Sequence, residues 1–254
     1  MSEQRKNLIR KLLQGIETGD PAAVAVVDEE KYIQHNPQTH TGSEGLSALF
    51  ARLAQSNPRV HIVRVFADGD FVFAHTEYDF STRRIGFEIF RFEGERAVEH
   101  WDNIQPRLGP NPSGRTMVDG PTECTDWDCT EENRELVRNF VQEILIERRF
   151  ERMHQHVHDE HFAQHNPALP DGLAAWKGAL QAQSHSGPVL CYQRMHRIVA
   201  EGSFVLSVCE GTRAGVHSAF YDLFRVSSRK IVEHWDTIEA VAPQSQWKNQ
   251  NGKF

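Results

Sequence analysis

One pentapeptide, VEHWD, occurs twice in the chain, at 98–102 and at 232–236. Tryptophan and histidine are rare residues, so an identical string that contains both is not expected by chance. Two further blocks recur in the same order: QHNP at 34–37 and 164–167, and RVFADGDFVF at 64–73, which is matched by RIVAEGSFVL at 197–206. Blocks that repeat in order with small changes of spacing are typical of a duplicated domain. The two halves are therefore expected to share one fold.

The length of the chain and one stretch of unusual composition place the boundary between the copies. A chain of 254 residues accommodates two domains of ordinary size. Residues 106–123 are rich in proline and glycine, which is typical of a connection. We therefore predict a first domain with its C-terminal linker over 1–123 and a second domain over 124–254.

Each half reads as helices followed by strands. Apolar residues show helical spacing over 3–19 and 131–149, and the same pattern predicts two shorter helices in each half. These shorter helices are expected over 21–30, 43–54, 150–159 and 171–184. Four strand-like runs follow in each half, and Asp-Gly or Glu-Gly separates the first two runs, as in a hairpin. The pattern predicts an α+β unit in which helices cover one face of a curved antiparallel sheet.

Composition narrows the classes of function. The net charge of −7 argues against nucleic acid as a partner, because such binding needs a basic face. No window of 18 apolar residues predicts a membrane span, and the N-terminus lacks the apolar core of a signal peptide. The four cysteines do not suggest a disulfide framework, so we expect a cytoplasmic protein.

The repeated pentapeptide places a histidine and an aspartate on one face of a strand. Successive strand residues face opposite sides, so His100 and Asp102 lie together, as do His234 and Asp236 in the second copy. Aliphatic neighbours on that face would partly desolvate both groups, which is the environment of many general acids and bases. The alternative is structural, since a buried His–Asp pair can satisfy itself by hydrogen bonding.

The preceding strand also carries a carboxylate among aromatic residues in each copy. Such a break in the hydrophobic pattern is expected at a functional site. Glu88 and Asp222 are therefore added to the candidate catalytic residues. The histidines of the two QHNP motifs are either pocket-lining or structural, and Trp101 and Trp235 are expected to pack on the opposite face. The candidate substrate-binding residues are His35, His75, Phe71, Phe73, Phe90, Phe92, His165, Phe220 and Phe224.

A metal site is the other common use of histidine and carboxylate side chains. The chain contains no HExxH, no paired CxxC and no other ligand spacing that fixes a geometry. Val208 stands in the second copy where His75 stands in the first. Neither a glycine-rich phosphate loop nor a nucleophile elbow is present. We therefore predict no metal and no cofactor.

These motifs, taken in order, resemble a known family. YIQHNP, the hairpin ADGDFVFAH, a strand that ends in FRF, and AVEHWDNIQ resemble the SnoaL-like polyketide cyclases, and more closely the branch described as predicted aldol-condensation enzymes. The resemblance covers nearly all of 1–123 and most of 131–240. It implies two tandem cone-shaped α+β barrels of the nuclear-transport-factor-2-like fold, each around an apolar pocket.

The resemblance also implies roles for individual residues. The cyclases use an aspartate on the last strand as the acid/base, and this position matches Asp102 and Asp236. Their histidine on the preceding strand is replaced here by Glu88 and Asp222, which departs from the cyclase pattern. Because the family assembles as dimers, the fused copies are expected to form an intramolecular pseudo-dimer.

The leading hypothesis is a cofactor-independent acid/base enzyme that acts on a small apolar carbonyl compound as a cyclase, isomerase or aldol-type lyase. Asp102 would transfer the proton, His100 would orient or polarise, and Glu88 would be a second acid/base. We expect the first half to be the more active one. The alternatives are a non-catalytic small-molecule binding protein and an epoxide hydrolase-like enzyme. Arg91 and Arg225 alternate away from the carboxylates, which counts against epoxide hydrolysis.

Overall fold

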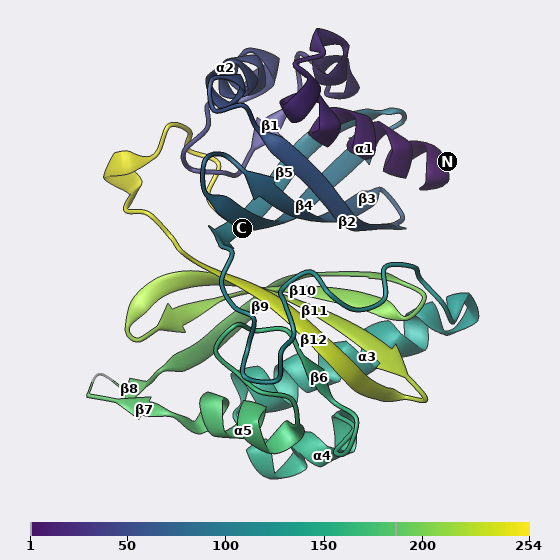
Figure 1. Ribbon diagram of the computed structural model, residues 1–254, viewed down its shortest axis with the longest axis vertical. Helices are drawn as coiled ribbons and strands as arrows, with labels where there is room; N and C mark the ends of the chain where they lie inside the picture. The colour runs from purple at the N-terminus through teal and green to yellow at the C-terminus, as the bar shows by residue number, and fades with distance from the viewer. Residues whose placement is uncertain (1, 186) are drawn as a thin grey trace. The chain divides into compact units, whose positions relative to one another are not determined.

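The computed structural model describes residues 2–185 and 187–254, which form two compact units. The first unit runs to Arg107 and also takes in Val241–Phe254, and the second unit is Leu108–Ala240. The predicted boundary at 123/124 divides the duplicated sequence, whereas the compact units divide the chain differently. Each unit contains a short segment that follows the strands of the other copy (Figure 1).

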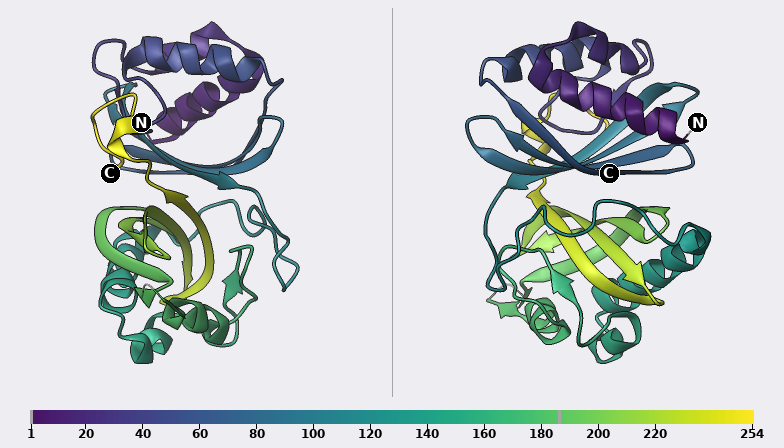
Figure 2. Two further views of the ribbon diagram at one scale, coloured as in Figure 1. Left: turned by 90° about the vertical axis from the view of Figure 1, so that its left-hand side faces the viewer. Right: turned by 45° about the vertical axis from the view of Figure 1, so that its right-hand side comes forward.

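The helical part of the first unit consists of α1 (Ser2–Thr18), the 3-10 helix η1 (Pro21–Val26) and α2 (Gly42–Ala54). Helix α1 buries one apolar stripe, because its large aliphatic residues recur three and four positions apart. These residues are Ile9, Leu12, Leu13 and Ile16. The short helix expected over 21–30 is confined to η1. Helices α1 and α2 lie on one face of the sheet (Figure 2).

The sheet of the first unit is a meander of long antiparallel strands with one short parallel strand at its edge. The long strands are β2 (Arg59–Asp68), β3 (Phe71–Asp79), β4 (Arg83–Glu93) and β5 (Arg96–Pro106). Strand β1 (Ile33–Gln34) comes from the QHNP motif and pairs in parallel with β5, which gives the order β1-β5-β4-β3-β2. Gly69 closes the β2–β3 hairpin with φ 57°, a conformation that glycine adopts without strain.

The second unit repeats this arrangement. Its helical elements are η2 (Trp127–Cys129), α3 (Thr130–Phe140), the π-helical η3 (Val141–Ile146), η4 (Phe150–Arg152), α4 (Met153–His156) and α5 (Leu173–Gln181). Its main strands are β6 (Ala163–Gln164), β9 (Leu190–Glu201), β10 (Phe204–Arg213), β11 (Val216–Ser227) and β12 (Lys230–Ala240). The sheet order β6-β12-β11-β10-β9 is the order of the first unit, so the duplication extends to topology.

A few smaller elements complete the description. Strands β7 (Gln183–Ser184) and β8 (Gly187–Pro188) form a separate small hairpin, and η5 (Gln244–Gln246) lies in the segment that follows β12. All four cysteines are free thiols. Among the described residues, no helix is both long and apolar enough to span a membrane. The α+β class and the tandem arrangement predicted from the sequence are confirmed, and both sheets are open rather than closed barrels.

Candidate active site

The first unit encloses a cavity of about 400 Å³ between its helices and its sheet. Helices α1 and α2 supply aliphatic and aromatic side chains, among them Leu12 and Leu46. Strands β4 and β5 supply a polar wall formed by Glu88, His100 and Asp102. A mostly apolar cavity with a few converging polar groups is the usual form of a small-molecule site.

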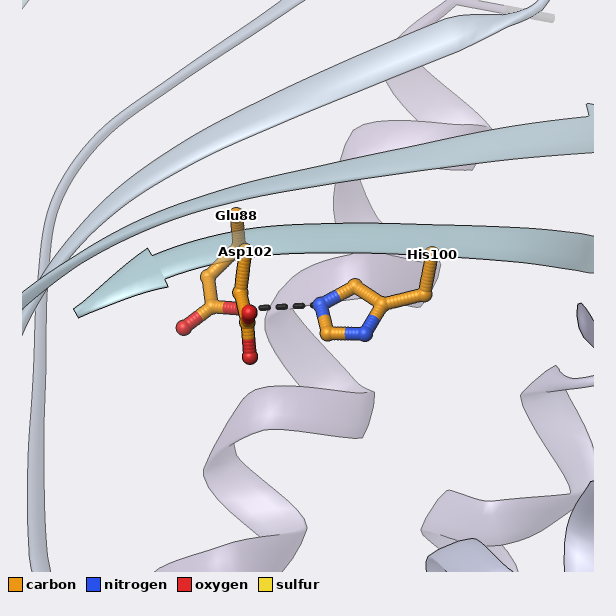
Figure 3. A group of neighbouring side chains, drawn as sticks. All are labelled: Glu88, His100 and Asp102. Carbon is orange, nitrogen blue, oxygen red and sulfur yellow. Dashed lines mark hydrogen bonds and ion pairs between the residues drawn. The ribbon is translucent and has the colours of Figure 1, made fainter. Parts of the chain in front are cut away.

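A chain of hydrogen bonds fixes His100 on this wall. Gln34 Oε1 accepts the backbone N–H of Asn36 and also lies 2.9 Å from His100 Nδ1. Because Gln34 Oε1 is an acceptor, His100 Nδ1 carries a proton, and His100 Nε2 is left to face Glu88 Oε2 at 2.8 Å. Figure 3 shows this contact, with Asp102 beside Glu88. Both ring nitrogens of His100 are therefore held, one by Gln34 and the other by the Glu88 carboxyl group.

Asp102 is held by other contacts than those that fix His100. Asn36 Nδ2 donates to Asp102 Oδ2 at 2.5 Å, and Lys253 Nζ lies 3.3 Å from Asp102 Oδ1. The side chains of Asp102 and Lys253 are 5% and 2% exposed. Asp102 and His100 share a face, as predicted, but His100 bonds to Glu88 rather than to Asp102.

Two tyrosines complete the polar wall. The Tyr78 hydroxyl donates to Glu88 Oε1 at 2.8 Å. Tyr32 lines the cavity, and its buried hydroxyl has no hydrogen-bond partner among the described residues. Burial raises the pKa of both phenols well above its usual range, and the nearby charge of Glu88 adds to the effect. Both groups therefore remain hydrogen-bond donors at neutral pH.

The three acidic and imidazole groups also lie close enough to be considered for a metal ion. The donor atoms of Glu88, His100 and Asp102 lie within 4.8 Å of one another. Two contacts oppose such a use: the Lys253 ammonium lies beside Asp102, and His100 is already hydrogen-bonded at both ring nitrogens. The surroundings fit proton transfer better than cation binding.

The second unit repeats the same polar frame. Gln164 Oε1 lies 3.0 Å from His234 Nδ1, and His234 Nε2 lies 2.9 Å from Asp222 Oδ1. Asn166 donates its backbone N–H to Gln164 and its side-chain amide to Asp236 Oδ2. Burial raises the pKa of Asp236. The contacts in the two units therefore correspond pair by pair.

The QHNP loops show which residues around the two frames are equivalent. Gly42 N donates to Tyr32 O, and Gly172 N donates to Phe162 O, both at 3.0 Å. Tyr32 and Phe162 are thus equivalent positions. The second unit has no hydroxyl at the place where the first unit turns a phenol into its cavity.

The helices that follow these loops also carry different side chains at equivalent positions. Counting four residues on from the paired glycines places Leu46 opposite Trp176. Trp176 stacks on His234 with ring centroids 4.5 Å apart, and Phe224 stacks on His234 at 5.1 Å. Trp176 also stacks on Phe162 at 4.9 Å. Phe90 stacks on His100 as Phe224 does on His234, so the difference lies in Trp176, whose indole packs against His234 where the first unit has Leu46 on its cavity wall.

Several residues predicted to bind substrate lie on the other face of the sheets. The β3–β4 register pairs Ala74 with Glu88, so the even-numbered residues of β3 share the cavity face. Neither QHNP histidine lines the cavity, because each stacks on the tryptophan of the neighbouring strand at 4.6 Å. In contrast to the prediction, the residues on this opposite face are His35, His75, Phe71, Phe73 and His165.

The remaining predicted residues lie on the cavity side. Phe90 lines the cavity and stacks on His100 at 4.3 Å, whereas Phe92 is buried in the core behind it. Phe220 and Phe224 belong to the core of the second unit. The sequence interpretation did not single out Gln34, Asn36, Tyr32, Tyr78 or Lys253. The repeated QHNP contained a signal for the first two, since Gln34 and Asn36 alternate with His35.

Both units thus consist of helices that cover a curved sheet, and the first unit encloses an apolar cavity with acid–base groups at one wall. Residues 9–100 match the family described as SnoaL-like domain. This match confirms the resemblance seen in the motifs of the first copy. No curated protein was found to match the chain.

Solved structures of similar architecture match one copy's length of the chain. TsrD from Streptomyces laurentii is 20% identical and covers 41% of this chain and 89% of its own, with a TM-score of 0.37. An NTF-2 like protein of unknown function from Burkholderia xenovorans is 15% identical over 43% of this chain and 89% of its own (TM-score 0.39). An LEH-like epoxide hydrolase from M. tuberculosis is 16% identical over 41% and 84% (TM-score 0.36).

Proposed function

We propose that the first unit is an acid–base enzyme that acts on a small, largely apolar carbonyl compound by proton transfer next to the carbonyl group. One observation carries the proposal: a carboxylate, Asp102, and a buried phenol, Tyr32, both face the same apolar cavity. The phenol has no hydrogen-bond partner among the described residues, so a ligand oxygen can take that place. The volume of about 400 Å³ suits a ligand of one or two rings.

The roles of the residues follow from their contacts. Asp102 Oδ accepts the proton from the α-carbon, and the Tyr32 O–H donates to the carbonyl oxygen as negative charge develops there. The hydrogen-bonded pair of His100 and Glu88 can deliver a proton to a second site on the same ligand. Return of a proton to a different atom gives an isomerisation, and attack of the enol carbon on a second carbonyl gives a cyclisation or aldol-type step.

The second unit is proposed as the non-catalytic copy. Its frame retains Asp222, His234 and Asp236, but Trp176 stacks on His234 where a ligand would lie. The same His–carboxylate grouping therefore has a structural role there. This proposal ranks the first copy above the second, as the sequence comparison does.

Two other functions remain as alternatives. A binding protein would use the same cavity without proton transfer. Epoxide hydrolysis is less favoured because Arg91 and Arg225 bind Glu99 and Glu233, each at 2.7 Å, on the face of each sheet opposite Glu88 and Asp222.

The test is the exchange of α-protons of 2-tetralone and acetophenone in D₂O, followed by NMR. Asp102→Asn is expected to lose about 10²–10⁴-fold in exchange rate, the usual contribution of a positioned acid/base. Asp236→Asn is the matched control in the second copy and should exchange like the wild type. Binding of a ketone without exchange would identify a binding protein, and a loss confined to Asp236→Asn would reverse the ranking of the two copies.

A further inference from the structure

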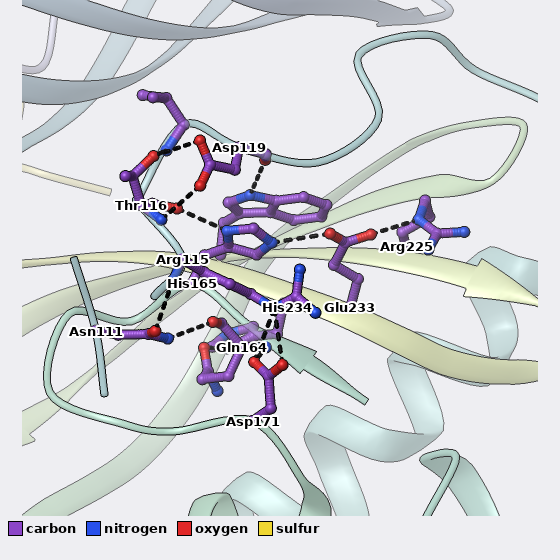
Figure 4. Close-up of polar contacts among 12 residues, drawn as sticks. Asn111, Arg115, Thr116, Asp119, Gln164, His165, Asp171, Arg225, Glu233 and His234 are labelled. Carbon is purple, nitrogen blue, oxygen red and sulfur yellow. Dashed lines mark hydrogen bonds and ion pairs between the residues drawn. The ribbon is translucent and has the colours of Figure 1, made fainter. Parts of the chain in front are cut away.

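Each unit is completed by a segment that follows the strands of the other copy. In the second unit this segment comes directly after β5. Asn111 Nδ2 donates to Gln164 O at 2.6 Å, and His165 Nδ1 donates to Thr116 O at 2.6 Å (Figure 4). These two contacts attach the segment after β5 to the QHNP loop of the second unit.

The first unit receives the segment after β12 in the same way. Asn251 Nδ2 donates to Gln34 O at 2.9 Å, and His35 Nδ1 donates to Gly252 O at 2.9 Å. Asn249 Nδ2 adds bonds to the backbone oxygens of Asn36 and Thr39. The two QHNP loops thus bind their segments by equivalent contacts, and Gly252 occupies the place of Thr116.

The next residue of each segment is where the two units differ. Lys253 follows Gly252, and Met117 follows Thr116. Both side chains are buried, at 3% and 2% exposed. Lys253 Nζ lies 3.3 Å from Asp102 Oδ1, so the first unit carries an ammonium group beside its aspartate, whereas the second unit carries a methionine at the corresponding chain position.

A buried ammonium group is costly unless it is paired, so this lysine must have a compensating partner. The carboxylate of Asp102 supplies the opposite charge. Asn36 and Lys253 contact different oxygens of that carboxylate, Oδ2 and Oδ1. Two contacts on two oxygens fix the plane of the group, which a single amide contact does not.

We propose that Lys253 is a positioning residue of the first site, and that the segment Val241–Phe254 completes this site by carrying Lys253 to Asp102. Lys253 holds the orientation of the carboxylate that receives the substrate proton. The role rests on the proposed function, because it is defined by proton transfer at Asp102. The equivalent Met117 ends in a thioether, which carries no positive charge and cannot donate a hydrogen bond, in keeping with the proposal that the second copy is not catalytic.

The experiment compares Lys253→Met, which copies the second unit, with Lys253→Arg. Lys253→Met is expected to lower kcat for ketone exchange by about 10- to 100-fold, the cost of a misplaced catalytic group, and to leave the Kd of 2-tetralone within about twofold. Lys253→Arg should recover most of kcat, because it keeps the charge. Met117→Leu is the control for a change of side chain in the equivalent segment and should match the wild type.

Thermal melting on the same samples separates positioning from stability. If Lys253→Met, assayed well below its melting temperature, had the kcat of the wild type, the proposal would be overturned. Equal losses of kcat in Lys253→Met and Lys253→Arg would also overturn it.

A second measurement does not depend on activity. The ¹H–¹⁵Nζ signal of Lys253 should be protected from exchange with water and should shift in Asp102→Asn. An unprotected signal that ignores Asp102→Asn would disprove the ion pair. A protected, responsive signal in a wild type that exchanges no ketone would contradict the proposed function but retain the completed site.

Discussion

The two units build the same hydrogen-bonded frame and surround it differently. In each, a glutamine fixes the histidine of the repeated pentapeptide, and the histidine faces a carboxylate of the preceding strand. Around this frame the first unit leaves a cavity, and the second unit packs aromatic rings. The His–carboxylate grouping is therefore compatible with either a site or a core, and the lining determines which one forms.

The tyrosine that reaches the carboxylate shows how far the lining has diverged. In the first unit Tyr78 comes from β3, where it pairs with Val60 of β2. In the second unit the paired positions are Gly211 and Tyr192, and the phenol of Tyr192 comes from β9 to reach Asp222. The same hydrogen bond is thus made from opposite strands of one cross-strand pair.

A glycine on the next strand makes the first of these arrangements possible. A Cβ atom at Gly86 would lie 2.7 Å from both Tyr78 Cε2 and Glu88 Oε1, closer than real contacts allow. The β4–β5 and β11–β12 registers place Phe220 at the equivalent position, where its ring packs on Tyr192 at 4.3 Å. The size of the residue on the next strand therefore matches the strand that supplies the tyrosine. The small Gly86 accompanies Tyr78, and the large Phe220 accompanies Tyr192, so each core is closely packed.

The largest expected effect comes from giving the first unit the lining of the second. Leu46→Trp should place an indole against His100, as Trp176 lies against His234. We expect binding of 2-tetralone, measured by calorimetry, to weaken by about 10²-fold or more. Overpacking should cost about 1–3 kcal/mol of stability at most.

The reverse change tests the same comparison. Trp176→Leu should cost about 2–4 kcal/mol of stability because it leaves a cavity in the second unit. The cavity should admit 2-tetralone beside His234. Undiminished binding in Leu46→Trp would show that the ligand does not lie against His100, and the equivalence of the two helices would then explain nothing about function.

A smaller effect is expected from exchanging the hydroxyl group that separates Tyr32 from Phe162. Tyr32→Phe removes the proposed donor to the carbonyl oxygen and should lower kcat for ketone exchange by about 10²-fold, with little change in stability. Phe162→Tyr adds a phenol to the packed copy and should not create activity. A Tyr32→Phe enzyme with the rate of the wild type would exclude a role for the phenol in proton transfer.

The duplicated order of motifs allowed the α+β class and the tandem arrangement to be predicted, because periodicity and repetition are local properties of a sequence. Alternation placed His100 and Asp102 on one face, and the break in the hydrophobic pattern of the preceding strand singled out Glu88. It failed for His75, since alternation within one strand does not say which face meets the helices, and the pairing of Ala74 with Glu88 decides this. Lys253 could not be predicted, because its contact with Asp102 depends on a segment that joins the first unit from the far end of the chain.

The smallest expected effect concerns the titration of Asp236. Burial raises its pKa, and the neighbouring charge of Asp222 acts in the same direction, while His234 and Asn166 oppose the shift. The folded state therefore holds the proton more tightly than the unfolded state. The free energy of unfolding therefore falls as the pH rises from the pKa of Asp236 in the unfolded state, about 3.9, to its raised pKa in the folded state. Above that pKa it falls no further.

Asp236→Asn removes this titration while its amide oxygen can still accept from Asn166. The variant should be more stable than the wild type near neutral pH, and the difference should vanish below about pH 3, where the wild-type carboxyl group is protonated in both states. Urea unfolding at several pH values measures it. Asp102→Asn should change stability in the opposite direction, because it leaves the buried Lys253 ammonium without its carboxylate. Equal responses of the two variants would mean that Lys253, which lies beside Asp102, does not distinguish the two sites.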